Sequence, residues 1–125
     1  MLQIFFEMQT IKQIYINDFG TSFYWRKENK VIVDKVQLVF KEMGFYCNKL
    51  EIEQFKECIK ESYSVNSECA DCELKSKCYK FLLKTPFSQI DLAVTMQELD
   101  KLKDLVEGTI FKINLDDYLY GVGMN

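Results

Sequence analysis

The N-terminal third of the chain alternates between apolar and polar positions with the two-residue period of β-strands. Two alternating runs flank the turn-forming cluster Asn-Asp-Phe-Gly at 17–20, so residues 1–30 are predicted to centre on a β-hairpin. Residues 31–40 are apolar at both odd and even positions, which indicates a central strand covered on both faces over part of its length. A shorter strand is predicted at 45–50.

Helical periodicity begins near residue 52, where apolar side chains recur every three or four positions between charged ones. This helix is predicted to end within 64–67. Two more strands are predicted further along the chain, at 79–84 and at 90–94, because a proline-containing turn separates two short apolar runs.

A second helix is predicted to follow. Thr95 and Glu98 have the spacing of a capping box, in which the two side chains satisfy each other's backbone N–H groups at a helix start. Apolar residues then repeat at helical spacing from Leu99 to Ile113. Gly108 interrupts this helix at a cost of about 1 kcal/mol relative to alanine, which allows a kink or an early end there.

The order strand, strand, helix therefore occurs twice, in residues 31–66 and again in residues 79–120. Residues 67–78 form a cysteine-rich loop between the two units. We predict a single domain of the α+β class over residues 1–125, with a mostly antiparallel sheet of about five or six strands and two helices on one face. The two units would be pseudo-repeats joined by the cysteine-rich loop.

A constant offset of forty-four residues aligns the two units in sequence. It places Leu38 on Leu82 in the first strands, and Phe55 on Leu99 in the helices. Because the same offset aligns the strands, the turns and the helices of the two units, we interpret the match as an internal repeat.

Composition narrows the class of protein. The chain has 125 residues, is 48% hydrophobic and carries a formal net charge of −3, as expected of a globular domain. It has no run of five or six like charges, no basic start of a signal peptide and no apolar run near the roughly 18 residues that span a bilayer. We therefore expect a cytoplasmic protein that binds neither nucleic acid nor membranes.

Histidine is absent from the chain, which excludes Ser-His and Cys-His catalytic pairs and mixed Cys/His zinc sites. The five glycines are scattered and form no phosphate-binding loop. The sequence therefore contains no positive sign of an enzyme.

The five cysteines supply the one candidate site. Cys69, Cys72 and Cys78 lie within ten residues, and in a reducing compartment such a cluster is more often a metal or redox site than a set of structural disulfides. Structural zinc requires four ligands, and Cys58 on the first predicted helix is a better candidate for the fourth than Cys47.

We favour zinc because the loop is polar and charged, whereas an iron–sulfur cluster, the less favoured cofactor, is usually shielded by apolar cover. Free thiols with no cofactor remain an alternative. Cys58 also fits the apolar stripe of its helix, where a small buried cysteine is common.

Four segments carry a resemblance to a known family: Val-Gln-Leu-Val-Phe at 36–40, Leu-Lys-Thr-Pro at 83–86, Ile-Asp-Leu-Ala-Val at 90–94 and Glu-Leu-Asp-Lys-Leu at 98–102. Over about residues 21–106 the chain resembles a family of small bacterial domains of unknown function, and this resemblance implies no activity. Members of the family carry Cys-x-x-Cys ahead of the first of these segments, whereas here the cysteine cluster lies between the two units.

The spacing Cys-x2-Cys-x5-Cys, taken alone, resembles the ends of iron–sulfur sites in radical-SAM auxiliary domains and in certain DNA nucleases. The auxiliary-domain pattern continues to a further cysteine, where this chain has Leu82.

Two functions follow as expectations, and a small enzyme with a carboxylate or lysine site is a third, for which the sequence gives no positive evidence. The first is a non-enzymatic protein-interaction or adaptor domain, because the second helix is long enough to leave apolar surface for a protein partner or for a homodimer. The alternative is an iron–sulfur or thiol-based redox protein or sensor that uses the cysteine cluster. Phe23 and Trp25 share one face of a predicted strand and are expected to pack in the core, with Tyr24 on the opposite face.

Overall fold

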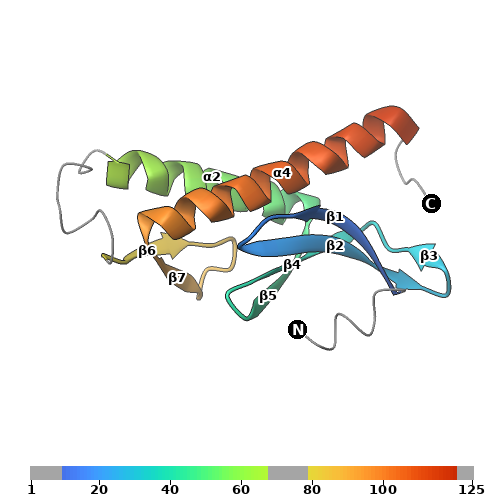
Figure 1. Ribbon diagram of the computed structural model, residues 1–125, viewed down its shortest axis with the longest axis horizontal. Coiled ribbons are helices and arrows are strands. Elements are labelled where there is room, and N and C mark those ends of the chain that lie inside the picture. The colour runs from blue at the N-terminus through green and yellow to red at the C-terminus, as the bar shows by residue number, and fades with distance from the viewer. Residues whose placement is uncertain (1–9, 68–78, 121–125) are drawn as a thin grey trace.

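The computed structural model describes residues 10–67 and 79–120 of the chain. They form two helices and seven short strands in a single α+β domain, as predicted (Figure 1). The elements are β1 (Ile11–Ile16), β2 (Gly20–Lys27), β3 (Lys30–Val31), β4 (Lys35–Phe40), β5 (Met43–Asn48), α2 (Lys49–Ser67), β6 (Phe81–Lys84), β7 (Asp91–Val94) and α4 (Met96–Tyr120).

The main sheet has five strands and every pairing in it is antiparallel. Its order is β1-β2-β4-β5, and β3 pairs with the end of β2. β6 and β7 pair with each other as a separate two-stranded sheet, so the hairpin of the second unit does not extend the main sheet. The run 31–40, expected as one strand, is divided between β3 and β4.

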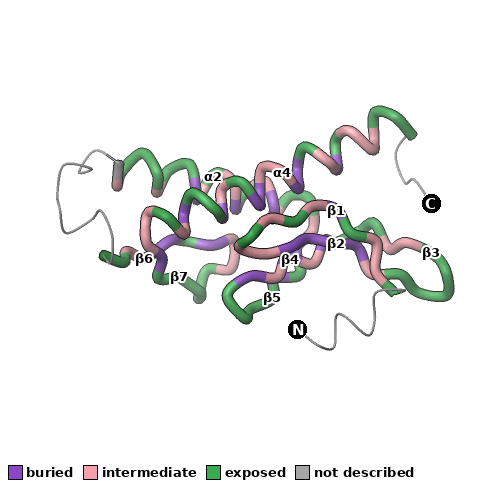
Figure 2. Tube along the Cα trace, viewed as in Figure 1, coloured by how far each residue is buried: buried purple, intermediate pink, exposed green. Residues whose placement is uncertain are grey.

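The two helices pack side by side on one face of the strands, as predicted (Figure 1). α4 lies over β1 and β2, and α2 lies over β5 and β6. The side chains between the helices and the strands form the main core, which Figure 2 shows as buried segments on the facing sides of these elements. Its most buried members include Leu38, Phe40, Phe55, Leu102 and Leu105.

Both helices begin with the same reciprocal capping box. The backbone N–H of Thr95 donates to Glu98 Oε1 at 3.0 Å and that of Glu98 donates to Thr95 Oγ1 at 3.1 Å, as the sequence predicts. Asn48 and Glu51 exchange the equivalent two bonds, each 2.8 Å, at the start of α2. The strand predicted at 45–50 ends at residue 48 instead, because Asn48 is the last residue of β5 and its side chain caps α2.

The constant offset of forty-four residues was also wrong. It pairs buried Leu38 with Leu82, which is 67% exposed. The two capping boxes are instead 47 residues apart, since Asn48 corresponds to Thr95. The connection between the two strands is longer in the second unit, so the offset increases across it.

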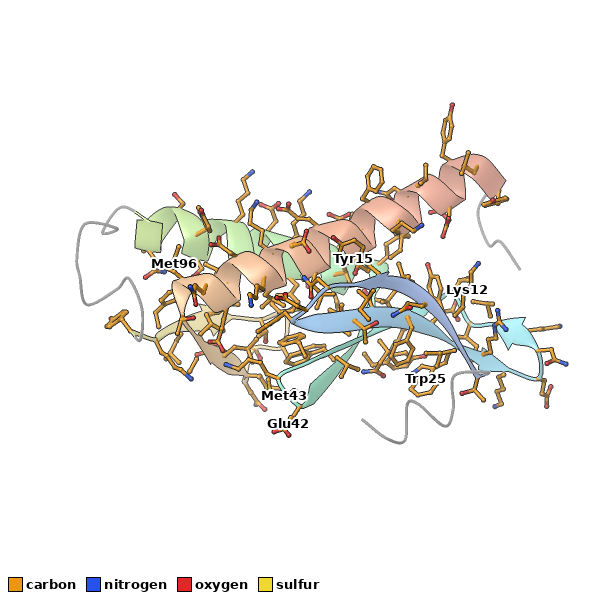
Figure 3. All side chains as sticks on the ribbon, viewed as in Figure 1. Lys12, Tyr15, Trp25, Glu42, Met43 and Met96 are labelled. Atoms are coloured by element: carbon orange, nitrogen blue, oxygen red, sulfur yellow. The ribbon has the colours of Figure 1, made fainter. Side chains whose placement is uncertain are left out.

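α4 continues without interruption through Gly108, so a kink or early end does not occur. A Cβ atom at this position would lie 2.4 Å from Cζ of Tyr15, which packs on the helix from β1 (Figure 3). The Tyr15 hydroxyl donates to the carboxylate of Asp104, 3.0 Å from each oxygen. The glycine therefore provides space for a side chain of the sheet.

Candidate functional site

Three of the four predicted metal ligands, Cys69, Cys72 and Cys78, lie outside the described residues. Cys58, the fourth, lies on α2 and packs against the core. Within 10–67 and 79–120 there is no group of three or more Cys, Asp or Glu residues that could hold a metal ion. Zinc at this set of cysteines therefore stays a prediction.

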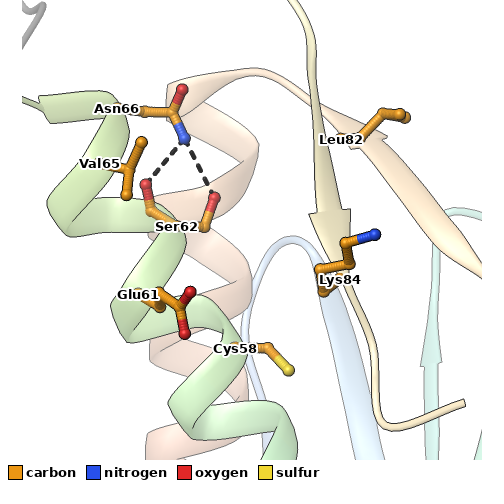
Figure 4. A pocket seen from close by; sticks show the side chains of 7 residues that line it. All are labelled: Cys58, Glu61, Ser62, Val65, Asn66, Leu82 and Lys84. Atoms are coloured by element: carbon orange, nitrogen blue, oxygen red, sulfur yellow. Dashed lines mark hydrogen bonds between the residues drawn. The ribbon is translucent and has the colours of Figure 1, made fainter. Parts of the chain in front are cut away.

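Cys58 borders a groove of about 200 Å³ between the second half of α2 and β6 (Figure 4). The groove lies between the two elements that the cysteine-rich segment connects, because α2 ends at Ser67 and β6 begins at Phe81. Figure 4 shows the Cys58 sulfur directed from α2 towards β6. The groove is lined by Cys58, Glu61, Ser62, Val65, Asn66, Leu82 and Lys84.

The position of Cys58 sets a condition on metal binding. It is nine residues before the end of α2, which corresponds to about 14 Å along the helix axis. A shared ion would require the segment after Ser67 to return along the groove by that distance. The sequence could not reveal this requirement, because the ten residues between Cys58 and Cys69 set no direction in space.

The two cysteines that the structure describes have the electrostatics of inert thiols. Burial, followed by the charge of Glu51, raises the pKa of Cys47 to about 12. Burial also raises the pKa of the Cys58 thiol, and the carboxylates of Glu61 and Glu57 add to that effect. Reactive cysteines have a lowered pKa instead, so the surroundings of these two thiols disfavour the thiolate form.

The second feature is an apolar face on the C-terminal half of α4. Phe111, Tyr118 and Leu119 are exposed by 65%, 86% and 56%, and Leu115 between them is half-buried. Successive residues of an α-helix are about 100° apart, so these four share one side, roughly opposite the buried stripe of the same helix. We call Phe111, Leu115, Tyr118 and Leu119 the outer face of α4.

The C-terminal turns of α4 rise away from the strands (Figure 1), while their inner side contacts the rest of the domain. Lys49 Nζ at the start of α2 lies 2.9 Å from Asp117 Oδ2. Ile113 is the last buried residue of the helix. The inner side of these turns is therefore packed against the domain, and the outer face is exposed to solvent.

The third feature is the sheet face that the helices do not cover. Phe23 and Trp25 share a face as predicted, and this is the helix-free face. Phe23 is fully buried, as expected of a core residue, although it lies outside the main core, whereas Trp25 is only partly buried. Ser22 shows the orientation of β2, because its hydroxyl bonds to Thr109 of α4 at 2.6 Å. Figure 3 places Trp25 on the side of the sheet opposite the helices. Tyr24, by contrast, belongs to the main core.

Neither α2 nor α4 combines the length and apolar character that crossing a bilayer requires. A scan against protein-family models, a search of curated proteins and a search of solved structures each returned no significant match.

Proposed function

We propose that this protein is a cytoplasmic, non-enzymatic interaction domain that binds another protein through the outer face of α4. The observation that supports the proposal is the exposure of Phe111, Tyr118 and Leu119 on a helix whose opposite side is buried in the fold. Large apolar side chains grouped on one exposed face mark interaction sites in soluble proteins. Aromatic residues are also the commonest binding anchors.

The size of the outer face favours a partner with an apolar groove over a second copy of this chain. An aromatic side chain buries about 150–250 Å² in full, so two aromatic residues and their two leucine neighbours supply roughly 500 Å². A standard interface buries about 800 Å² on each partner. Two outer faces placed against each other would fall short of that area, whereas a groove that surrounds the helix adds contact on its flanks.

The spacing of the outer face fits the same mode of binding. Phe111, Leu115 and Tyr118 are at positions i, i+4 and i+7, which is the anchor pattern of a helix that enters a hydrophobic groove. Because the inner side of α4 is already packed, the helix needs no folding step on binding, and little conformational entropy is lost.

Structural zinc on Cys58, Cys69, Cys72 and Cys78 is the second part of the proposal. α2 ends, and β6 begins, at the end of the domain opposite the C-terminal turns of α4 (Figure 1), so such a site would stabilise the fold without touching the partner. Elemental analysis of purified protein should give one zinc per chain, lost in Cys72→Ser. Zinc retained in that variant, iron with sulfide, or no metal would each contradict this part.

Photo-crosslinking tests the docking helix. A benzoylphenylalanine at position 118 reports the outer face, and one at position 64 is the control. Ser64 corresponds to Phe111 when the units are aligned by their capping boxes, and it is exposed on α2. We expect position 118, and not position 64, to capture one discrete protein.

That protein, once identified and purified, should bind the wild-type chain and bind Phe111→Asp at least tenfold more weakly, a loss of about 1.4 kcal/mol. Crosslinks only to a second copy of the chain would replace the proposed partner with a homodimer. Equal capture at both positions, or none, would overturn the proposal.

A further inference from the structure

The outer edge of β5 carries backbone hydrogen-bonding groups that point away from the sheet. The two-residue turn at 41–42, with φ angles of 50° and 61°, makes Phe40 and Met43 a pair that exchanges both backbone bonds. Because this orientation alternates along a strand, the N–H and C=O groups of Gly44 and Tyr46 face outward. Among the described residues, no strand pairs with β5 on this side.

The free edge is limited to these two residues. The next outward N–H, that of Asn48, donates to Glu51 Oε1 at 2.8 Å, and the turn begins at the other end of the strand. Gly44 is exposed, and Tyr46 is 40% exposed. Each chain therefore presents a short edge with two donors and two acceptors that are open to solvent.

The two edges of the main sheet differ in their protection against a further strand. β1 contains Lys12, and its register with β2 is irregular between Gln13 and Tyr15. Charged residues and bulges are common devices that keep a second strand from adding to an edge. β5, Met-Gly-Phe-Tyr-Cys-Asn, contains no charged residue and no proline, and it pairs with β4 in unbroken register. β5 therefore has the properties of an edge that accepts another strand.

We infer that a second copy of the chain pairs with this edge, β5 against β5, in antiparallel register about a two-fold axis at Phe45. This register sets Gly44 opposite Tyr46 of the second copy, and Tyr46 opposite its Gly44, so the outward groups of both copies form four hydrogen bonds. A shifted register would leave some of these groups unpaired, because the N–H of Asn48 is already bonded. The contact is symmetric, so it closes at two copies.

The side chains beside the edge fit the same arrangement. Tyr46 lies on the helix-free face and would extend over Gly44 of the second copy, a favourable cross-strand pair of an aromatic residue with an edge glycine. Lys35 pairs across the strands with Asn48, which would face Glu42 of the second copy. Within 10–67 and 79–120, neither Lys35 nor Glu42 has an ion pair of its own. Opposite charges would thus meet twice across the axis.

The two copies would share one continuous antiparallel sheet. Its two-fold axis is perpendicular to the sheet, so the helices of both copies lie on the same face. α4 lies over β1 and β2, the strands furthest from the axis. The outer faces of both copies therefore stay open, and the dimer presents two docking helices.

Sedimentation velocity at a series of concentrations tests the pairing. The full chain should sediment with twice the mass of one chain and dissociate on dilution. Tyr46→Lys places a charge on the free edge and should raise the dissociation constant of the dimer at least about tenfold. The matched control is Ile16→Lys on β1, where Ile16 is 62% exposed, and it should leave the dissociation constant unchanged. Circular dichroism verifies that both variants are folded.

A disulfide tests the register without destabilising the edge. When Gly44→Cys and Tyr46→Cys chains are mixed, the two new residues should lie opposite each other, about 5.5 Å apart between Cα atoms, within the range of a disulfide. Mass spectrometry should find a disulfide between positions 44 and 46, and none between identical positions. A full chain that is monomeric at every concentration would overturn the inference. A dimer that Tyr46→Lys leaves intact, a dimer that Phe111→Asp dissociates, or no disulfide between 44 and 46 would overturn it too.

Discussion

In the unit β4–β5–α2 the hairpin closes through two residues and belongs to the main sheet, whereas in β6–β7–α4 six residues separate the strands and the hairpin forms a sheet of its own. The helices also differ in length, with 19 residues in α2 and 25 in α4. The starts of the two helices are nonetheless alike, since both have a reciprocal capping box. The two units therefore share the local sequence signal that starts their helices. They differ in the pairing of their hairpins and in the length of their helices.

Burial follows the capping boxes from one unit to the other. Ile52, Phe55 and Ile59 of α2 are fully buried, and the residues 47 positions later, Leu99, Leu102 and Val106, are fully buried as well. The additional turns of α4 have no counterpart in the described part of α2. They carry most of the outer face, so the feature to which we assign binding is the main departure from the repeat.

Lys41 connects the two units. It lies in the two-residue turn of the first hairpin, where Lys41 and Glu42 have φ angles of 50° and 61°. Such left-handed turns favour Asn and Gly. Lys41 Nζ lies 3.1 Å from Glu98 Oε2 at the start of α4 and donates to Ala93 O of β7 at 3.1 Å. A lysine at a position that disfavours it is thus explained by contacts with the second unit.

The largest expected effect comes from truncating equivalent core positions. Phe55→Ala and Leu102→Ala each remove a fully buried side chain, and we expect losses of about 3–5 and 2–5 kcal/mol in the free energy of unfolding. Urea denaturation measures both. A loss below about 1 kcal/mol in either variant would show that the two helices do not share one core, since only exposed sites are that tolerant.

The next largest effect is expected from Gly108→Ala, which should change stability differently from alanine at the equivalent position of α2. Alanine favours a helix over glycine by about 1 kcal/mol, but its Cβ would meet the Tyr15 ring. We expect net destabilisation of about 1–3 kcal/mol, as for overpacked sites. The equivalent residue of α2 is exposed Glu61, where alanine should change stability by less than about 0.5 kcal/mol. Stabilisation by Gly108→Ala would contradict the contact with Tyr15.

Removing either capping box should lower the free energy of unfolding by a similar amount. Asn48→Ala and Thr95→Ala each remove the side-chain acceptor of one backbone N–H at a helix start, at an expected cost of about 1 kcal/mol each. Thermal or urea unfolding of the two variants side by side measures the costs. A cost at only one helix would show that the two starts are not equivalent.

The smallest effect is a pH dependence of stability that arises from Glu98 at the start of α4. Burial alone would raise the pKa of Glu98, but the Thr95 N–H and the neighbouring Lys41 outweigh burial and lower this pKa below its ordinary value of 4.5. A depressed pKa means that ionised Glu98 stabilises the fold above the unfolded-state pKa, and this contribution is lost as pH falls through the folded-state value. Glu98→Gln should therefore lose less stability than wild type between about pH 5 and 3. Equal losses of stability in Glu98→Gln and in wild type over this pH range would rule out a contribution from ionised Glu98.

Local signals predicted much of this fold. The alternation of residues 11–16, the turn cluster after it and the Thr95–Glu98 spacing predicted β1, the first hairpin and the start of α4 close to where the structure has them. These features depend on neighbours in sequence. The Asn48–Glu51 box has the same spacing, but the preceding strand was predicted to continue to residue 50, so α2 was predicted to start too late.

Other features depend on tertiary contacts that a single sequence does not display. Gly108 was interpreted from helix propensity, whereas the ring of Tyr15, 93 residues earlier, determines its role. The pairing of Phe23 and Trp25 was predicted, but which sheet face the helices cover was not. The outer face had a sequence signal, since Phe111, Leu115 and Tyr118 recur at helical spacing outside the main stripe. A comparison of this second stripe with the main apolar stripe of α4 would have identified the outer face from the sequence.

The most direct test of the docking helix is the crosslink yield from position 118 in a chain that also carries Phe111→Asp. Because Phe111 is 65% exposed, this substitution should leave the free energy of unfolding within about 0.5 kcal/mol of wild type, which urea denaturation of the same sample verifies. We predict that the crosslink to the partner is then lost while the domain stays folded. An undiminished crosslink from a folded Phe111→Asp chain would contradict the assignment of the outer face as the binding surface.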